Sequence, residues 1–352
     1  MRESEGVFFV KVFQDVAFRW SWENNQPHLP SSIAQRTKNS VEDASGRLPM
    51  PNSELAQRKA AVGCWHPPPL LISLNLCYTA PMVFSSSFLA LLCVALVLSG
   101  LGWYRFLYFL SVGYGLAVVG CSVSLIVLYS DCLQPSSFTL CFLLILYGLR
   151  LSGFLLIREM KSTSYKKALP QLTQTSKPIT FPFKLMIWLS VAILYAMQVS
   201  PVFFRLDNVS RMLPTNWVWA SIGGLVMAFG IALESWADLQ KYQAKQQNPH
   251  RFCDTGLYRM VRCPNYLGEI IFWTGCFISG IGSNQTVGQW LVSTLGYLSI
   301  VYIMFGGARR LEIRQNKNYG DDPEYQCYVK NTPILIPLVP LYHLEQYTFL
   351  KG

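Results

Sequence analysis

Charged residues are scarce in this chain of 352 residues. They make up 14% of the sequence, against roughly 25% in soluble globular proteins, whereas hydrophobic residues make up 51%. This shortage argues against an ordinary soluble domain and favours a protein embedded in a membrane. A net charge of +10 would suggest nucleic-acid binding in a soluble protein. Here the placement of the charges is more informative, and we expect no nucleic-acid partner.

Metal-ligand patterns and the common nucleotide motifs are also missing. The chain has only four histidines, none spaced as a ligand pair, and none of its ten cysteines forms a CxxC pair. We therefore expect no metal site and no disulfide framework. The sequence contains no GxGxxG after a strand, no GxxxxGK[ST], no GxSxG and no HExxH. Any nucleotide site is therefore not of the Rossmann type.

Two regions of different composition follow one another along the chain. Residues 1–75 mix Ser, Asn, Gln, Pro and charges of both signs and contain no apolar run of 18 residues, so we interpret them as a disordered extension. The segment "GVFFVKVF" is too short for a signal peptide. Residues 76–352 are rich in long apolar runs and predict one all-α domain, a polytopic bundle of transmembrane helices.

The apolar runs predict about seven membrane spans. Each is close to the roughly 20 residues that a helix needs to cross a bilayer, and the sixth is the shortest. The predicted spans are residues 79–100, 106–129, 137–157, 183–203, 217–234, 266–282 and 287–306.

Lysine and arginine are distributed unequally between the two sets of connecting segments. Basic residues number six, five and six in segments 158–184, 235–265 and 307–352. They number none, two and none in segments 130–136, 204–216 and 283–286. Because basic segments stay on the cytosolic side, this predicts a cytosolic C-terminus. Sequons at Asn208 and Asn284 fall in segments on the opposite side and agree weakly with this orientation.

Arg150 is a charged residue inside an apolar run, "LLILYGLRLSGFLLIRE". Such a charge is costly in a membrane and usually marks a site, unless the side chain reaches the interface. Tyr147 lies three residues earlier and therefore shares a helix face with Arg150. Gly148 and Gly153 would let a second helix or a ligand approach this helix.

Glu234 and Asp238 end the fifth predicted span, and Lys241 follows. At a spacing of four residues the two carboxylates share one helix face and repel each other unless a positive group lies between them. A solvated helix end is the alternative interpretation.

The stretch "RMVRCPNYLGE" places Asn265 and Glu269 on the same face at the start of the sixth predicted span. Pro264 suits a first helical turn, and a carboxylate near a helix N-terminus is favoured by the dipole. Capping does not explain the three arginines just upstream, or the basic run "RRLEIRQNK" on the same side of the membrane. These groups predict a cytosolic bowl for a phosphate-bearing ligand. The upstream arginines are Arg251, Arg259 and Arg262.

The segment "DTGLYRMVRCPNYLGEIIFWTG" resembles the signature of the steroid 5-alpha-reductase family, G-L-[WYF]-x-x-x-R-H-P-N-[YF]-x-G-[ED]. The resemblance extends over roughly residues 140–340 and includes "YGLR", "ADLQKYQ" and the tail "NYGDDPEYQCYVKNTPILIPLVP". It implies a seven-helix oxidoreductase of the endoplasmic reticulum that uses NADPH to reduce a carbon–carbon double bond conjugated to a carbonyl in a lipid.

The resemblance also implies roles for individual residues. Asn265 and Glu269 match the pair that holds the nicotinamide carboxamide, and Tyr147 matches the tyrosine that donates to the substrate carbonyl. The other implied cofactor contacts are Asp238, Arg251, Arg150, Arg259, Arg262, Tyr266, Arg310 and Tyr328. The residue types fit, because an amide and a carboxylate together complement a carboxamide, and arginines complement the pyrophosphate and 2′-phosphate.

This chain departs from the family pattern in three respects, one of which is the N-terminal extension of about 70 residues, which has no counterpart in the family. Cys263 stands where the signature has histidine, and the first two predicted spans contain no Asp or Glu to pair with Tyr147. Asp131, just beyond the second span, is a poor substitute. Tyr147 would therefore work alone, or the substrate is not a 3-keto-steroid.

Two other classes of protein stay open at this stage. Membrane methyltransferases that use S-adenosylmethionine carry a related "RHPxYxG" element, and a transporter or structural membrane protein could retain the same fold. The paired Asn265 and Glu269 favour the reductase, because nicotinamide needs both.

Overall fold

The computed structural model describes residues 85–161 and 180–350, and every regular element in these two ranges is helical. This confirms the predicted all-α class. The predicted disordered extension, residues 1–75, lies outside the described residues, so that prediction stays untested.

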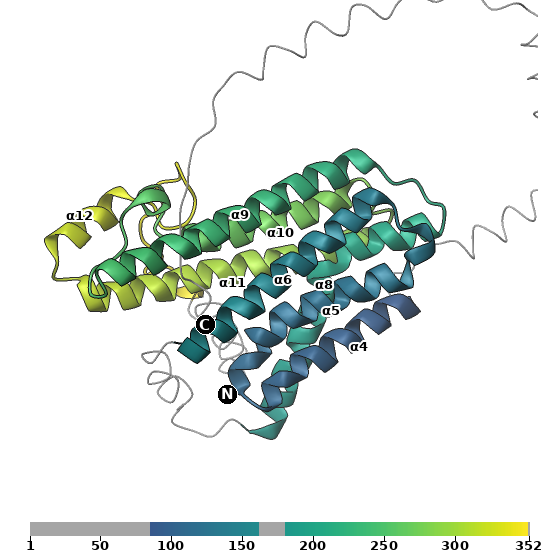
Figure 1. Ribbon diagram of the computed structural model, residues 1–352, viewed down its shortest axis with the longest axis horizontal. Coiled ribbons are helices and arrows are strands. Elements are labelled where there is room, and N and C mark those ends of the chain that lie inside the picture. Colours follow the sequence, from purple (N-terminus) through teal and green to yellow (C-terminus); the bar gives the residue numbers. More distant parts are fainter. Residues whose placement is uncertain (1–84, 162–179, 351–352) are drawn as a thin grey trace, which may run out of the picture. The chain divides into compact units, whose positions relative to one another are not determined.

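Seven long helices lie at the positions of the seven predicted spans, and a short helix follows them (Figure 1). In chain order they are α4 (Ser86–Ser99), α5 (Val112–Leu128), α6 (Pro135–Lys161), α8 (Phe181–Ser210), α9 (Trp217–Gln247), α10 (Pro264–Ile281), α11 (Val287–Tyr319) and α12 (Pro323–Asn331). Short 3-10 turns at Gly100–Trp103 and Phe106–Phe109 precede α5, so this helix begins later than the predicted residue 106.

Five of these helices are long and apolar enough to cross a membrane. They are α4 with the turn that follows it, α6, α8, α9 and α11. At 17 residues, α5 is a shorter apolar helix, and α10 is absent from the candidate spans among the described residues. The first two turns of α10 carry buried polar side chains, which lower its apolar character. The structure thus supports a multi-pass membrane protein, with fewer evident spans than the seven predicted.

Helices α9 and α10 pack against each other through glycines spaced seven residues apart on each helix. A Cβ added at Gly223 would lie 2.5 Å from the Gly275 carbonyl oxygen, and one at Gly230 would lie 2.5 Å from the Phe272 nitrogen. A Cβ at Gly268 would lie 2.7 Å from a backbone nitrogen of α9. Backbones this close require residues without side chains, as in other membrane helix pairs. The contact sets the first turns of α10 directly against α9.

Helices α5 and α6 meet at a second glycine pair. A Cβ at Gly148 would lie 2.4 Å from the Gly115 carbonyl oxygen, and one at Gly115 would lie 2.7 Å from the Gly148 carbonyl oxygen. The expectation that Gly148 admits a second helix is confirmed, whereas Gly153 has nothing within 4 Å. Because Tyr114 and Tyr147 directly precede these glycines, the contact brings the two tyrosines together.

Four helices continue beyond their predicted ends, α6 by four residues, to Lys161, and three others by more. The sequence predicts ends near residues 203, 234 and 306, but α8, α9 and α11 extend to Ser210, Gln247 and Tyr319. Hydropathy marks where the apolar part stops, whereas a helix continues as long as its backbone hydrogen bonds are favourable.

The extension of α8 overturns the interpretation of the first sequon. Asn208 is wholly buried in α8, and its Nδ2 donates to the Ser283 carbonyl oxygen at 2.6 Å. It is therefore an internal polar residue rather than an exposed acceptor for a glycan, and it gives no information on orientation.

Candidate functional site

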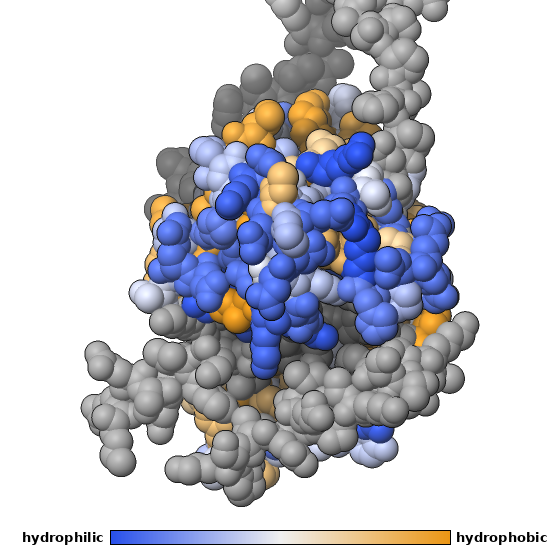
Figure 2. Space-filling view, turned by 90° about the vertical axis from the view of Figure 1, so that its left-hand side faces the viewer, coloured by the Kyte–Doolittle hydropathy of each residue, from blue (hydrophilic) through white to orange (hydrophobic). Residues whose placement is uncertain are grey.

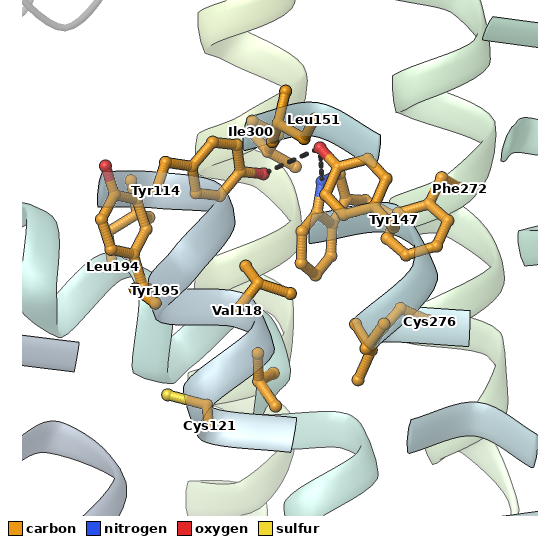
Figure 3. Close-up of a cluster of buried hydrophobic side chains, with 14 of the residues drawn as sticks. Tyr114, Val118, Cys121, Tyr147, Leu151, Leu194, Tyr195, Phe272, Cys276 and Ile300 are labelled. Carbon is orange, nitrogen blue, oxygen red and sulfur yellow. Dashed lines mark hydrogen bonds between the residues drawn. The ribbon is translucent and has the colours of Figure 1, made fainter. Parts of the chain in front are cut away.

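A buried hydrogen-bonded cluster joins α5, α6 and α10. The Tyr147 hydroxyl donates to Glu269 Oε1 at 3.0 Å, and the Trp273 indole N–H donates to the Tyr147 oxygen at 3.3 Å. The Tyr114 hydroxyl lies 3.2 Å from that of Tyr147 and 3.4 Å from Glu269 Oε1. Figure 3 shows the two tyrosine hydroxyls pointing toward each other. Tyr147 therefore has two further polar partners, a carboxylate on α10 and a second hydroxyl on α5.

Aromatic packing fixes the orientation of both tyrosine rings. Tyr147 stacks on Phe272 with ring centroids 4.0 Å apart, and the edge of the Trp273 ring meets it at 82°. Tyr114 stacks on Tyr195 at 4.8 Å. Such contacts hold a polar tip in one place while burying the ring. The packing of the rings therefore holds the two hydroxyls in one orientation.

Asn265 and Glu269 face the same direction, as the sequence predicts, and both are buried, with 2% and 0% of their surface exposed. Among the described residues, neither Asn265 Oδ1 nor Glu269 Oε2 has a hydrogen-bond partner. A buried acceptor without a partner costs about 1–3 kcal/mol. Two such atoms one helical turn apart therefore suit a ligand that brings donors to both.

Arg150 joins two carboxylates of the neighbouring helix. Its guanidinium forms salt bridges with Glu234 and with Asp238 on α9, and its side chain is only 16% exposed. Arg150 is thus the positive group that lets two like charges share one helix face. The structure brings together Arg150 and Asp238, two of the predicted cofactor contacts, but as partners of each other. It also includes Glu234, which was not among the predicted site residues.

Arg262 points into the protein rather than into a bowl of arginines. It is 2% exposed and donates to Glu312 Oε1 at 3.0 Å and to the Tyr342 carbonyl oxygen. The other oxygen of Glu312 accepts from the backbone nitrogens of Leu344, at 2.7 Å, and Glu345, at 3.1 Å. Arg262 and Glu312 therefore anchor the C-terminal tail against α11 and the start of α10.

The other two upstream arginines are exposed. Arg251 forms salt bridges with Glu324 at 2.5 Å and with Asp254 at 2.8 Å, and hydrogen bonds to both carboxylates raise the pKa of Arg251. Arg259 lies exposed at the end of the 3-10 turn Gly256–Arg259. Of the three upstream arginines, only Arg251 and Arg259 are thus exposed to solvent, and Arg251 is already paired with two carboxylates.

The remaining predicted contacts lie near the same end of α10. Tyr266 is wholly buried, and its ring lies 3.3 Å from the position of a Cβ at Gly307. Arg310, partly buried, follows one turn later on α11. The Tyr328 hydroxyl donates to the Tyr258 carbonyl oxygen at 2.7 Å, and burial raises the pKa of Tyr328.

Cys263 has a structural environment in this chain. It is buried just before α10, its backbone N–H donates to the Ile334 carbonyl oxygen at 2.9 Å, and burial raises the pKa of its thiol to about 12. A protonated buried thiol is unreactive. The cysteine at this position of the signature thus packs against the tail.

Hydrophilic side chains cover the end of the molecule where α9 and α11 finish and where α12 lies (Figure 2). A polar surface at one end of a bundle of apolar helices indicates the part that lies outside the bilayer. Among residues 85–161 and 180–350, no group of three or more His, Cys, Asp or Glu could hold a metal ion, and the prediction of no metal stays a prediction.

One comparison with known proteins found a match, to a family model. The model of a family described as "Protein of unknown function (DUF1295)" matches residues 107–332, which is more than half of the chain. The chain belongs to the DUF1295 family. No curated protein matches it, and no solved structure matches it. The matched range contains the tyrosine pair and both open acceptors of this DUF1295 protein.

Sequence reasoning missed Tyr114 and Trp273. A signal for Tyr114 exists, because "GYGLA" and "LYGLR" each place a tyrosine directly before a glycine inside an apolar run. A glycine that permits close packing of two helices also places the side chain of the preceding residue near the point where the helices meet. Trp273 lies four residues after Glu269 and therefore shares its helix face.

Proposed function

We propose that this DUF1295 protein is an NADPH-dependent reductase of a carbon–carbon double bond conjugated to a carbonyl in a membrane lipid. The observation that carries the proposal is the pair of open acceptors, Asn265 Oδ1 and Glu269 Oε2, beside a tyrosine hydroxyl on the other oxygen of Glu269. The resemblance of the segment around them to steroid 5-alpha-reductases supports the same conclusion.

A nicotinamide carboxamide fits the two open acceptors. Its NH₂ group carries two donors, one for Asn265 Oδ1 and one for Glu269 Oε2, and its oxygen would accept from the Asn265 amide. When bound, the reduced cofactor would supply the reducing equivalent for the double bond. Asn265 and Glu269 would fix the orientation of the ring and thereby the face that reacts.

Tyr147 supplies the proton donor for the substrate. As the double bond is reduced, negative charge develops on the conjugated carbonyl oxygen, and a phenol placed there stabilises the charge and donates its proton. Because Glu269 Oε1 holds the Tyr147 hydroxyl at 3.0 Å, one carboxylate connects the cofactor position to the proton donor. The apolar helices around this group suit a lipid and exclude water.

The exposed arginines Arg251 and Arg259 are the residues best placed to take the phosphates of the cofactor, and a 2′-phosphate among them favours NADPH over NADH. The other proposed cofactor contacts lie near the start of α10, at the cofactor end of the site, and are Arg310, Tyr266 and Tyr328. We further propose the endoplasmic reticulum as the membrane and a cytosolic position for this end, from the sequence resemblance and the distribution of basic residues.

Ligand-dependent thermal stabilisation of the detergent-solubilised protein tests the cofactor. At about 100 times its dissociation constant, NADPH is expected to raise the melting temperature by roughly 5–10 °C, with a smaller effect of NADH and none of S-adenosylmethionine. Stabilisation by S-adenosylmethionine alone would exclude the reductase and favour a methyltransferase.

Variants of the open acceptors sharpen this test. Asn265→Leu and Glu269→Gln are each expected to abolish stabilisation by NADPH. Because Asn265→Leu removes a buried acceptor that has no partner, it should also raise the melting temperature of the ligand-free protein. Ser279→Ala is the matched control, since Ser279 is buried on the same helix and bonds only locally, to the Cys276 carbonyl oxygen at 2.6 Å.

A further inference from the structure

We propose that Tyr114 is a positioning residue for Tyr147, whose hydroxyl it holds and whose negative charge it stabilises when Tyr147 gives up its proton. This inference rests on the proposed function, since it assigns Tyr147 as the proton donor. It adds a residue on α5 that no part of the sequence resemblance assigns.

The number of hydrogens that Tyr147, Trp273 and Tyr114 can donate determines which of them donates to which. The Tyr147 oxygen carries one hydrogen and can accept two others. Trp273 can only donate, and it does so to this oxygen at 3.3 Å. Without a ligand, Tyr147 donates to Glu269 Oε1 at 3.0 Å. The Tyr114 hydroxyl lies within hydrogen-bond distance of the Tyr147 oxygen, at 3.2 Å, and of Glu269 Oε1, at 3.4 Å. Because the hydrogen of Tyr147 is already donated to Glu269, a hydrogen bond between the two phenols requires Tyr114 to be the donor.

Tyr114 assists the transfer of one proton from Tyr147 to the substrate oxygen. The Tyr147 O–H bond breaks, its electron pair stays on the Tyr147 oxygen, and the proton forms a new O–H bond on the substrate oxygen. The hydride that the proposed function assigns to NADPH forms the new C–H bond at the β-carbon, and the resulting enol tautomerises to the saturated carbonyl. Solvent returns a proton to Tyr147 afterwards. During the transfer the Tyr147 oxygen is an anion, which two N–H or O–H donors, from Trp273 and Tyr114, stabilise.

A phenol suits this position on α5 better than a carboxylate. Glu269 already brings a carboxylate to the cluster, and Glu234 lies on the helix packed against it. A further carboxylate would add repulsion in a medium of low dielectric constant. A carboxylate would also only accept, whereas the phenol of Tyr114 donates. Tyr114 therefore takes the place of the acid that the first two predicted spans lack, and it does so as a phenol rather than a carboxylate.

The backbone and ring of Tyr114 are held in place independently of its hydroxyl. Its ring stacks on Tyr195 at 4.8 Å, and the next residue, Gly115, packs against the Gly148 carbonyl oxygen. The substitution Tyr114→Phe therefore removes the hydroxyl and leaves the ring contacts.

Tyr195→Phe is the matched control. Tyr195 is a buried phenol of the same stacked pair, but its hydroxyl donates to the Phe109 carbonyl oxygen at 2.8 Å, away from Tyr147. With NADPH and two probes that carry a conjugated carbonyl (the enone cholest-4-en-3-one and the enal trans-2-hexadecenal), Tyr114→Phe is expected to lower kcat about tenfold with little change in KM. The dissociation constant for NADPH should be unchanged in both variants, and Tyr195→Phe should retain kcat.

A spectroscopic readout tests the same contact without turnover. In protein labelled with ¹³Cζ-tyrosine, Tyr114→Phe is expected to shift the resonance that disappears in Tyr147→Phe, and Tyr195→Phe should leave that resonance in place. An unshifted Tyr147 resonance overturns the inference, and so does a kcat of Tyr114→Phe equal to that of Tyr195→Phe. Failure of the wild-type protein to bind NADPH is a different result, which overturns the proposed function itself.

Discussion

At the scale of single residues, Arg150 is the positive group between two buried carboxylates. It lies between Glu234 and Asp238, which are 0% and 5% exposed, so its removal leaves two carboxylates close together in a buried position. Breaking a buried pair in this way typically costs 3–5 kcal/mol, because an uncompensated charge remains.

We therefore expect Arg150→Leu to lower the free energy of unfolding by about 3–5 kcal/mol, measured by denaturation in detergent. Adding Glu234→Gln should recover part of the loss, since it removes one of the two charges. Arg251→Leu is the control: Arg251 also pairs with two carboxylates, Asp254 and Glu324, but these side chains are 40%, 28% and 67% exposed, and its loss should cost under about 1 kcal/mol. Equal losses in the two arginine variants would contradict this account.

Residues that meet within one helix were predictable, whereas those that meet across helices were not. The shared face of Asn265 and Glu269 follows from a spacing of four, and the structure confirms it. Arg262 belongs to the same cluster of upstream arginines as Arg251. It points into the protein because it pairs with Glu312, which lies fifty positions later in the chain. Nothing local in the sequence distinguishes these two arginines.

At the scale of helices, glycines on facing surfaces decide which helices meet. The existence of the seven helices follows from apolar runs alone, but their pairing depends on where backbones can approach. Gly148 and Gly153 lie on the same helix, and only Gly148 contacts α5.

This difference gives a paired prediction. Gly148→Ala places a Cβ 2.4 Å from the Gly115 carbonyl oxygen and should destabilise the protein by about 1–3 kcal/mol. Gly153→Ala meets nothing within 4 Å and should stabilise the helix by about 0.5–1 kcal/mol. Melting temperatures of the two variants measure both effects. A Gly148→Ala protein as stable as the wild type would show that α5 and α6 are not in contact at this point.

At the scale of the whole molecule, orientation in the membrane is still a prediction, and cysteines provide its test. Cys327 on α12 is exposed, whereas Cys263 is buried with a thiol pKa raised to about 12. Because only the thiolate reacts, a maleimide at neutral pH should modify Cys327 and leave Cys263 intact.

In sealed microsomes, a membrane-impermeant maleimide added outside should label Cys327 if the C-terminal end is cytosolic. Labelling is followed by mass spectrometry of the Cys327 peptide, with Cys327→Ser as the control. Labelling of Cys327 only after the vesicles are permeabilised would reverse the predicted orientation.

The anchored C-terminal tail has a consequence for how the protein is made. The backbone of Arg262 and Cys263 donates to the carbonyl oxygens of Pro333 and Ile334, each at 2.9 Å, immediately before the helix that carries Asn265 and Glu269. Glu312 then holds residues still nearer the end of the chain. A ribosome that has synthesised all seven long helices has therefore not yet produced the segment that fixes the start of α10. A premature stop codon shortly after α12 would leave the membrane helices intact and the proposed site unfinished.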